Sequence, residues 1–500
     1  MKFNSIEELL ICTENIKGKT FEEIDTKNLL KTTHNLKRNK GILGHVVETG
    51  FYGYSINSNP KADFDEIGVE LKVTGYIKSK SGKLRAKERV SLSKIDYFGI
   101  VDEDYEFSKL IYKNKKILFI WYLYEEGKDI KDFMITDYQL YDMGQDEEVF
   151  KNDFELIKNK IRNGLAHTLS EGDTSYLGAC TKARTSKDRT KQPFSSTLAK
   201  PRAFSLKNSY MTGILNIFNF KVKNDLKNNL QKAQNSFKTI NSPTKRNIIS
   251  DTSGKITLKS SFSKNTNSKT VIKRLEDYNV PKEFKTVEDY VHDKIKPYIG
   301  KTQLEILEEI TGKTYKDKIP KNLNKLISDV LIGKDSELPE KDDLFKKTSF
   351  LIKNLPLTPK GKPRERMSFR TISLSEFIKP WDESDWKLFF EETTLIVICY
   401  REPRSGSKNG ERVLDGVKKI SFNDDDLKSF EITYNMIRKT IRNVDISYLP
   451  TPNSFDGQYL VVAPKGVKGD DAYNNMFKQD KTKIAFMLTK EFLCMKINCE

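Results

Sequence analysis

Apolar and polar residues alternate in several short segments of the chain, which is the pattern of half-buried β-strands. The segment Gly68–Thr74 is the clearest example. A nearly continuous apolar run over residues 117–124 predicts a strand buried on both faces, and its aromatic residues are expected in the sheet core. At the N-terminus, Ser5 and Glu8 form a capping-box pattern that opens an amphipathic helix. Strands and helices that alternate in this way predict an α/β fold.

Segments of the first 220 residues recur later in the same order. Val69–Lys72 leads through a glycine turn to Glu88–Ser91, and Phe350–Lys353 leads in the same way to Glu365–Ser368. Residues 156–163 and 203–206 recur as residues 436–443 and 485–488. The displacement between corresponding positions stays between 277 and 282 residues. Self-similarity at a nearly fixed spacing indicates a tandem duplication.

The segment between the two similar halves has a different composition. Residues 221–273 are rich in Lys, Asn, Ser and Thr, and Asp225 and Asp251 are their only acidic residues. This composition is typical of a basic linker, either a solvated tether or an arm that follows DNA. We therefore predict a domain over residues 1–220, a linker over residues 221–285 and a second domain over residues 286–500.

Charge favours a polyanionic partner. The 87 Lys and Arg residues exceed the 70 Asp and Glu residues, which gives a net charge of +17. Such a balance favours nucleic acid, although a solvated basic surface is the ordinary alternative. No apolar stretch approaches the roughly 20 residues that a membrane span needs, and the first residues do not resemble a secretion signal. No membrane association is expected.

Cysteine and histidine usage limits the metal chemistry. The chain has five cysteines, scattered and never spaced as CxxC, and four histidines. This pattern predicts neither a disulfide framework nor a zinc site, and it is typical of cytoplasmic proteins. Any metal ion is expected to have oxygen ligands.

Two carboxylates and a lysine are predicted to converge at the start of one strand. In the alternating strand after Gly68, Glu70 and Lys72 lie on the same face. Asp63 precedes Glu70 by seven residues, far enough for a turn to bring the two carboxylates together. Such oxygen ligands hold Mg²⁺ against a substrate phosphate, and a lysine can position the attacking water. The ordinary alternative is the solvated face of a strand.

The second half of the chain keeps the surrounding residues of this motif but not its two acidic residues. Leu351 stands at the position of Glu70 and Leu344 at the position of Asp63, whereas Lys353 matches Lys72. We interpret this difference as one active and one inactivated copy.

Three motifs together resemble the MutH family, which comprises a mismatch-repair nicking enzyme and the Sau-type restriction endonucleases that cut GATC. The motifs are Gly41–Glu48, Asp63 with Gly68–Lys72, and Pro201–Lys207. The tandem length resembles the longer restriction enzymes. The resemblance implies two PD-(D/E)xK, restriction-endonuclease-like domains, each with a mixed central sheet and flanking helices.

The resemblance also implies roles for individual residues. Asp63, Glu70 and Lys72 would be the catalytic residues, with Asp63 and Glu70 as ligands of Mg²⁺. Glu48 would be a further acid at the same site. The function implied is a type II restriction endonuclease that hydrolyses double-stranded DNA at GATC in the cytoplasm of a prokaryote. The alternatives are a MutH-like nicking endonuclease and a non-catalytic DNA-binding protein.

DNA contacts are expected from basic residues on loops and strands. The family reads bases with an Arg-Pro-Lys loop, whereas this chain has Cys180–Lys182, so only Lys182 carries over. Arg184, Arg202 and Lys207 are further predicted contacts, and we assign Arg184 to phosphate rather than to bases. Lysines 113, 115 and 116 are candidates for contacts near the scissile phosphate or, alternatively, for a solvated strand start.

Two further interactions are expected from the two-domain organisation. The C-terminal copy is predicted to bind DNA, at a second site, or to regulate the first copy. One active centre makes one cut at a time, so cleavage of both strands is expected to need either self-association on DNA or a second encounter with the site.

Overall fold

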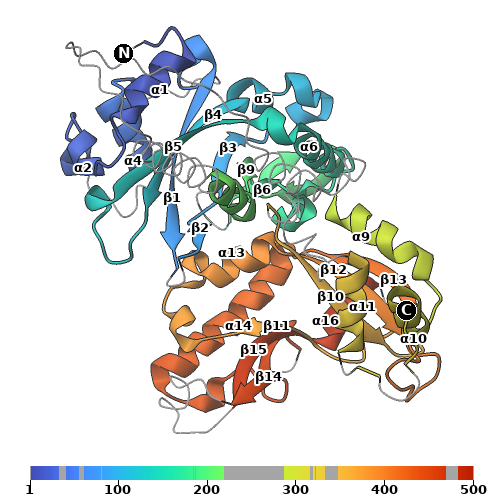
Figure 1. Cartoon of the computed structure of the whole chain (residues 1–500). Coiled ribbons are helices and arrows are strands. Elements are labelled where there is room, and N and C mark those ends of the chain that lie inside the picture. Colours follow the sequence, from blue (N-terminus) through green and yellow to red (C-terminus); the bar gives the residue numbers. More distant parts are fainter. Residues whose placement is uncertain are drawn as a thin grey trace, which may run out of the picture.

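The computed structural model describes most of the chain in two halves. The described residues are 2–32, 41–55, 61–79, 82–183, 185, 187–218, 286–315, 319–320, 322–332, 347–455, 457–468 and 482–498. The predicted linker, Arg184 and Leu344 lie outside these residues. Figure 1 shows the N-terminal half, coloured blue to green, lying against the C-terminal half, coloured yellow to red.

A four-stranded mixed sheet in the order β2-β1-β4-β5 forms the centre of the N-terminal half. Its strands are β1 (Val69–Lys78), β2 (Leu84–Ala86), β4 (Lys116–Leu123) and β5 (Met134–Asp142). β1 and β4 are parallel, whereas β2 and β5 are antiparallel to their neighbours. In β4, Phe119, Trp121 and Tyr122 are buried, which confirms the prediction that the aromatic run is sheet core.

Helices cover one face of this sheet. They are α1 (Ile6–Glu14), α2 (Phe21–Ile24), α3 (Leu29–Thr32), α4 (Ile42–His45) and the π-helical segment η2 (Val46–Phe51). The hydroxyl of Ser5 accepts a hydrogen bond from the backbone N–H of Glu8 at 3.2 Å, so the predicted N-cap is present. Leu118 and Ile120 of β4 belong to the apolar core on this side.

The opposite face of the sheet packs on a second layer. This layer contains α5 (Lys109–Asn114), α6 (Glu147–Arg162) and an antiparallel sheet of β3 (Val90–Lys94), β9 (Arg202–Leu206) and β6 (Leu177–Thr181). A hairpin of β7 (Thr190–Gln192) and β8 (Ser195–Ala199) lies between β6 and β9 in the chain. Ile117 and Phe119 of β4 belong to the core on this side.

The strands of the C-terminal half repeat the orders β1-β4-β5 and β3-β9-β6, without a counterpart of β2 in the described sheet. β10 (Phe350–Leu357) is parallel to β12 (Thr394–Arg401), and β13 (Val413–Ile420) is antiparallel to β12. The second sheet has the order β11 (Met367–Thr371), β15 (Thr482–Leu488) and β14 (Leu460–Lys468), all antiparallel. Its helices include α9 (Val287–Ile295), α10 (Gln303–Thr311), α11 (Leu323–Ile332), α13 (Asp385–Glu392), α14 (Asp424–Asn443) and α16 (Lys490–Ile497).

Strand register also corresponds between the halves. Glu70 of β1 lies opposite Ile117 of β4, and Leu351 of β10 lies opposite Leu395 of β12. Leu351 therefore occupies in β10 the place that Glu70 occupies in β1.

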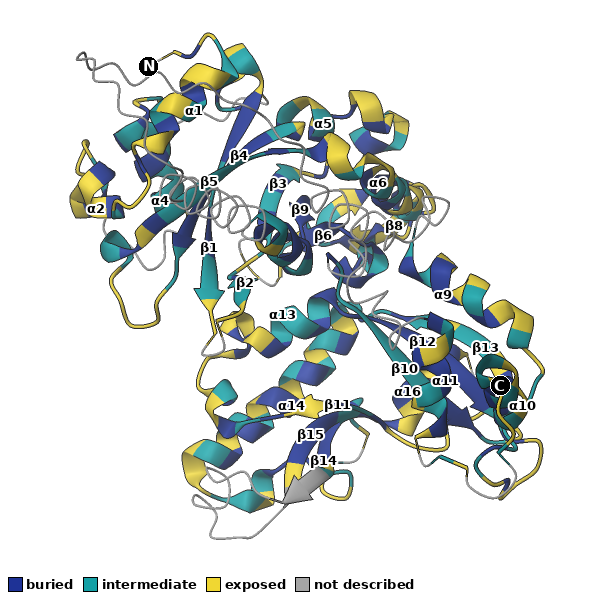
Figure 2. Ribbon diagram, viewed as in Figure 1, coloured by how far each residue is buried: buried dark blue, intermediate teal, exposed yellow. Residues whose placement is uncertain are grey.

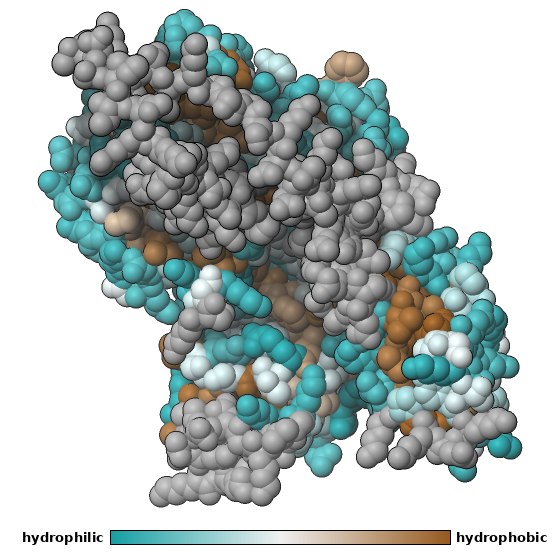
Figure 3. All heavy atoms as spheres, viewed as in Figure 1, coloured by the Kyte–Doolittle hydropathy of each residue, from teal (hydrophilic) through white to brown (hydrophobic). Residues whose placement is uncertain are grey.

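Polar contacts join the two halves. Arg202 donates to Asp424 at 3.0 Å, Lys347 donates to both carboxylate oxygens of Asp146 at 2.9 Å, and Arg89 pairs with Glu391 at 2.5 Å. One apolar cluster also contains buried residues of both halves. Figure 2 shows buried segments, in dark blue, on both sides of this boundary, and Figure 3 shows mainly hydrophilic side chains over the described outer surface of the same view.

The cysteines differ in state. Cys180 and Cys399 are free thiols, whereas Cys494 in α16 is disulfide-bonded. The scattered cysteine pattern did not predict this bond. In the described part of the chain, no helix is long and apolar enough to cross a membrane.

Candidate active site

A tight loop before β1 brings Asp63 beside Glu70. Phe64 and Val69 exchange backbone hydrogen bonds of 2.9 and 3.2 Å. Gly68 closes the loop with φ of 64°, a conformation that glycine adopts without steric cost. The backbone N–H of Asp63 then donates to Oε2 of Glu70 at 3.2 Å, and that of Leu71 donates to Oδ2 of Asp63 at 3.0 Å. The predicted turn is therefore present.

Two lysines converge on the other oxygen of Glu70. The Nζ atom of Lys72 donates to Oε1 of Glu70 at 2.7 Å, and Nζ of Lys113, from α5, lies 3.4 Å from the same oxygen. The side chain of Glu70 is only 2% exposed, whereas the lysines are about one-fifth exposed. A buried carboxylate needs such partners because burial removes its hydration.

Glu48 adds a third carboxylate from the π-helical segment η2. Burial, and then the neighbouring Asp63 and Glu70 carboxylates, raise the pKa of Glu48 to about 7. Burial also raises the pKa of Glu70, against the opposing effect of Lys72. The site therefore concentrates negative charge that its lysines only partly compensate.

The donor set fits a hard divalent cation, although no complete cage is present. Within the described residues, no group of three or more His, Cys, Asp and Glu side chains is arranged to hold a metal ion. The available donors are carboxylate oxygens of Asp63, Glu70 and Glu48, and an ion such as Mg²⁺ usually completes its shell with water and substrate phosphate. Burial and the neighbouring carboxylates raise the pKa of Glu48, and a cation bound among these oxygens would oppose that effect.

The corresponding place in the C-terminal half has no such cluster among the described residues. Lys353 donates to the backbone carbonyl of Ser368 at 2.8 Å rather than to a carboxylate. Burial, together with Lys465, lowers the pKa of Lys353 to about 8. Leu351 replaces the acid, so this position has a half-buried lysine beside a leucine instead of a carboxylate.

Two of the residues predicted to contact DNA are buried in this structure. Arg202 is buried and donates to the carbonyl of Ala179 at 2.6 Å as well as to Asp424. Lys207 is also buried, and its Nζ donates to the carbonyl of Thr174. Burial lowers the pKa of Lys207 to about 8. Both side chains are used inside the protein and are not available to DNA phosphates.

Lys182 remains compatible with its predicted role. It is exposed directly after β6, where its backbone N–H donates to the carbonyl of Pro201 at 2.8 Å. Among the three lysines proposed near the scissile phosphate, only Lys113 has an ion pair with Glu70. The sequence singled out Lys113 only by its position three residues before the buried strand β4. Nothing in the local sequence distinguished it from the neighbouring lysines.

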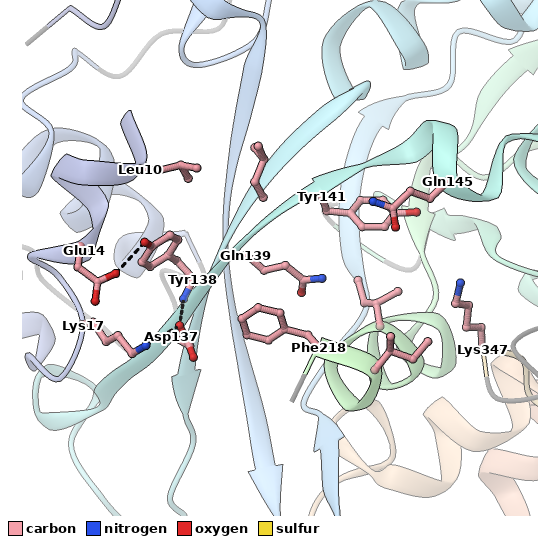
Figure 4. A pocket seen from close by; sticks show the side chains of 13 residues that line it. Leu10, Glu14, Lys17, Asp137, Tyr138, Gln139, Tyr141, Gln145, Phe218 and Lys347 are labelled. Carbon is pink, nitrogen blue, oxygen red and sulfur yellow. Dashed lines mark hydrogen bonds and ion pairs between the residues drawn. The ribbon is translucent and has the colours of Figure 1, made fainter. Parts of the chain in front are cut away.

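A separate pocket of about 500 Å³ lies along β5. Figure 4 shows Glu14, Lys17, Asp137 and Tyr138 at one end of it. The hydroxyl of Tyr138 donates to Glu14 at 2.7 Å, and Lys17 pairs with Asp137 at 3.1 Å. Because these polar groups satisfy one another, and because none of the candidate catalytic residues lines the pocket, we assign it no chemistry.

Comparison with known protein families indicates the class of protein to which this site belongs. The MutH family, described as DNA mismatch repair enzyme MutH, matches residues 52–153, the segment that contains Asp63, Glu70, Lys72 and Lys113. The fold and this site therefore define a MutH-like domain around the matched segment.

The individual relatives differ in how much of the chain they cover. The chain is similar to the type II restriction enzyme Sau3AI of Staphylococcus aureus, with 28% identity over 440 residues that span 84% of this chain and 78% of that protein. The DNA mismatch repair protein MutH of Shigella flexneri is 26% identical over 213 residues, which span 42% of this chain and 91% of that protein. A MutH protein of Escherichia coli is 27% identical over the same length. The match to Sau3AI therefore includes parts of both halves of this chain, whereas the match to MutH covers less than half of it.

Proposed function

We propose that this chain is a type II restriction endonuclease that hydrolyses phosphodiester bonds of double-stranded DNA with Mg²⁺, at the sequence GATC. The observation that carries the proposal is the buried Glu70 carboxylate, held by Asp63 on one oxygen and by Lys72 and Lys113 on the other. Similarity to Sau3AI over 84% of the chain supports the restriction class over a nicking enzyme.

Each side chain of the site has a chemical task in this proposal. Asp63 and Glu70 bind the metal ion, with Glu48 as an additional acid. When bound, the ion supplies Lewis acidity and a more acidic water molecule. Lys72, whose Nζ lies 2.7 Å from Glu70, orients the attacking water and offsets the charge of the phosphate. Lys113 offsets the same charge from α5.

The C-terminal half, residues 286–500, is proposed to be a degenerate copy that arose by tandem duplication and that binds DNA or regulates the first half. The repeated strand order and the equivalent register of Glu70 and Leu351 support the duplication. The proposed catalytic domain is residues 1–220. This proposal implies two partners. The C-terminal half would bind a second DNA site, and a second copy of the chain would associate with the first on DNA. A cytoplasmic location in a prokaryote belongs to the same proposal.

A nicking endonuclease is the second candidate. The match that spans 91% of a MutH mismatch repair protein favours it, although that match is confined to 42% of this chain. A third candidate, a DNA-binding protein without catalysis, would leave Glu70 without a chemical role.

Plasmid digestion separates these candidates. Unmethylated and GATC-methylated plasmids are incubated with the purified protein, with and without Mg²⁺, and the DNA ends are sequenced. Metal-dependent linear fragments that end at GATC are expected. Open circles without linear DNA would favour the nicking enzyme, cutting at other sequences would exclude GATC, and binding without any cutting would exclude both nucleases.

A further inference from the structure

Two lysines of the C-terminal half bind neighbouring backbone carbonyls of one strand. Nζ of Lys353, in β10, donates to the carbonyl of Ser368 at 2.8 Å, and Nζ of Lys465, in β14, donates to the carbonyl of Phe369. Nζ of Lys353 also lies 5.5 Å from the centre of the Phe369 ring. Within the residues that the structure describes, these carbonyls and this ring are the partners of both ammonium groups, and neither has an ion pair with a carboxylate.

Strand register relates both lysines to basic residues of the N-terminal half. Lys353 occupies in β10 the place of Lys72 in β1. Leu460, which opens β14, and Leu177, which opens β6, each lie opposite the last residue of the neighbouring strand, β15 or β9. Lys465 follows Leu460 by five residues, and Lys182 follows Leu177 by five residues. Lys465 therefore stands at the position of the exposed Lys182.

Acidic residues at corresponding places have partners of their own. Glu391 precedes β12 by three residues, as Lys113 precedes β4, but its carboxylate pairs with Arg89 of the N-terminal half at 2.5 Å. Asp329 lies in α11, which contacts β10, and pairs with Lys325 of the same helix. The C-terminal half thus keeps two lysines of the N-terminal half while the acid at the place of Glu70 is lost.

Two ammonium groups that lie together, half-buried, favour an anion between them. Burial, and then the charge of Lys465, lower the pKa of Lys353 to about 8. Each ammonium group has three N–H donors, and its backbone carbonyl takes one of them. An anion that accepts from both lysines would offset their repulsion, and the oxygens of a phosphate suit this geometry. Both side chains are partly exposed, so a ligand can reach them from solvent.

We propose that Lys353 and Lys465 form a phosphate-binding site in the C-terminal half, and that its ligand is a backbone phosphate of a second duplex segment. The phosphate oxygens accept hydrogen bonds from both ammonium groups. This inference rests on the proposed function, because it names the site through which the C-terminal half binds DNA. The bound segment is not the one that is cleaved, so neither lysine takes part in the reaction at Glu70.

A purely structural role for the two lysines makes a different prediction. Their hydrogen bonds to Ser368 and Phe369 would then serve only to fasten β10 and β14 to β11. In that case the double variant Lys353→Met with Lys465→Met would have a lower melting temperature, and its affinity for DNA would equal that of the parent.

The test counts the duplexes that one full-length chain binds. A short fluorescent duplex is titrated in Ca²⁺ instead of Mg²⁺, and the melting temperature is measured on the same samples. The parent is expected to bind one duplex at each half. Lys353→Met with Lys465→Met should weaken the second binding event at least about tenfold and decrease its slope of log affinity against log salt by about 1. Lys439→Met with Lys490→Met is the matched control, because it removes two exposed lysines from the same half.

The outcomes separate this inference from the proposed function. Loss of the second binding event in the double variant, with a parent-like control, supports the site. Parent-like binding of the second duplex, or a parent that binds only one duplex, overturns it, while cleavage by the parent leaves the endonuclease standing. If the parent neither binds nor cuts duplex DNA, the proposed function itself is wrong, and the site is wrong with it.

Inorganic phosphate is the second probe, since it offers the same oxygens without DNA. It is expected to leave binding of the second duplex unchanged at concentrations equal to that of the duplex. If instead inorganic phosphate raised the melting temperature of the parent but not of the double variant, while both bound DNA equally, the ligand would be free phosphate and the DNA assignment would be overturned.

Discussion

The carboxylate of Glu392 accepts a hydrogen bond from the backbone N–H of Asn208 at 2.6 Å, across the boundary between the two halves. Its other oxygen accepts from the N–H of Ser209 at 3.0 Å. A residue of the C-terminal half thus caps the helix over residues 208–218, which ends the described part of the N-terminal half. The two halves of the chain are therefore joined through a helix terminus, where free N–H groups need acceptors.

Glu392→Ala is expected to lower the free energy of unfolding by about 2 kcal/mol, because it leaves two buried N–H groups without an acceptor. Urea denaturation followed by tryptophan fluorescence measures this loss. Glu383→Ala is the control, since Glu383 is exposed in the same region. Equal stability of the two variants would mean that the cap contributes nothing.

Glu70→Ala is expected to abolish metal-dependent cleavage while duplex binding is retained. The reason is that Glu70 holds both lysines at its Oε1 atom and is a proposed metal ligand. Cleavage and gel-shift assays are compared with those of Glu66→Ala, which changes an exposed acid in the same loop. Residual cutting by Glu70→Ala at the parent rate would remove Glu70 from the catalytic set.

The two equivalent lysines are expected to respond differently to the same substitution. Lys72→Met removes a side chain that contacts Glu70, so cleavage should fall by about 10²-fold or more, as for loss of a proton-transfer or water-orienting group. Lys353→Met changes a lysine whose partners in the described part of the chain are the carbonyl of Ser368 and the ring of Phe369 rather than a carboxylate, so the cleavage rate should stay within about twofold of the parent. Single-turnover kinetics on a one-site plasmid measures both. Equal losses would show that the C-terminal half has a catalytic lysine after all.

Lys353 also gives a pH dependence of stability. Burial, with Lys465, lowers the pKa of Lys353 in the folded state to about 8, from an ordinary value of 10.5. Between these two pH values the unfolded chain holds the Lys353 proton more often than the folded chain does. The contribution of Lys353 to the free energy of unfolding therefore rises with pH in this range. Below pH 8 the lysine is protonated in both states, so its destabilising effect is constant.

The free energy of unfolding of Lys353→Met is therefore expected to exceed that of the parent most below pH 8, and this difference should shrink as pH approaches 10. Unfolding free energies of both proteins are measured across that range. A difference that is independent of pH would show that Lys353 titrates normally.

Substitutions of Arg202 and Lys182 are expected to affect different quantities, the free energy of unfolding for Arg202 and the affinity for DNA for Lys182. Arg202→Ala removes a buried guanidinium that donates to Ala179 and to Asp424, which keeps Lys200 as its other partner, so the unfolding free energy should fall by about 2 kcal/mol. Lys182→Ala changes an exposed side chain, so stability should be unaffected, while the slope of log affinity against log salt should decrease by about 1 if Lys182 neutralises one phosphate. The opposite pattern would restore Arg202 as a DNA contact.

Much of the local structure was predictable because short-range periodicity determines it. Alternation placed Glu70 and Lys72 on one face of β1, and the seven-residue spacing between Asp63 and Glu70 left room for the turn that brings the two carboxylates together. The apolar run over residues 117–124 could only be a buried strand, since no exposed element tolerates it. The spacing of recurring segments likewise predicted the repeated strand order.

Tertiary structure alone decided which basic residues are available. Arg202 and Lys207 lie in a motif that resembles a DNA-binding element, but Arg202 pairs across the boundary between the halves, and Lys207 is buried and donates to the carbonyl of Thr174. Lys113 joins Glu70 because α5 packs beside β1, a contact between elements more than 30 residues apart in sequence. Sequence periodicity specifies the face on which a side chain lies, whereas its exposure depends on which distant element covers that face.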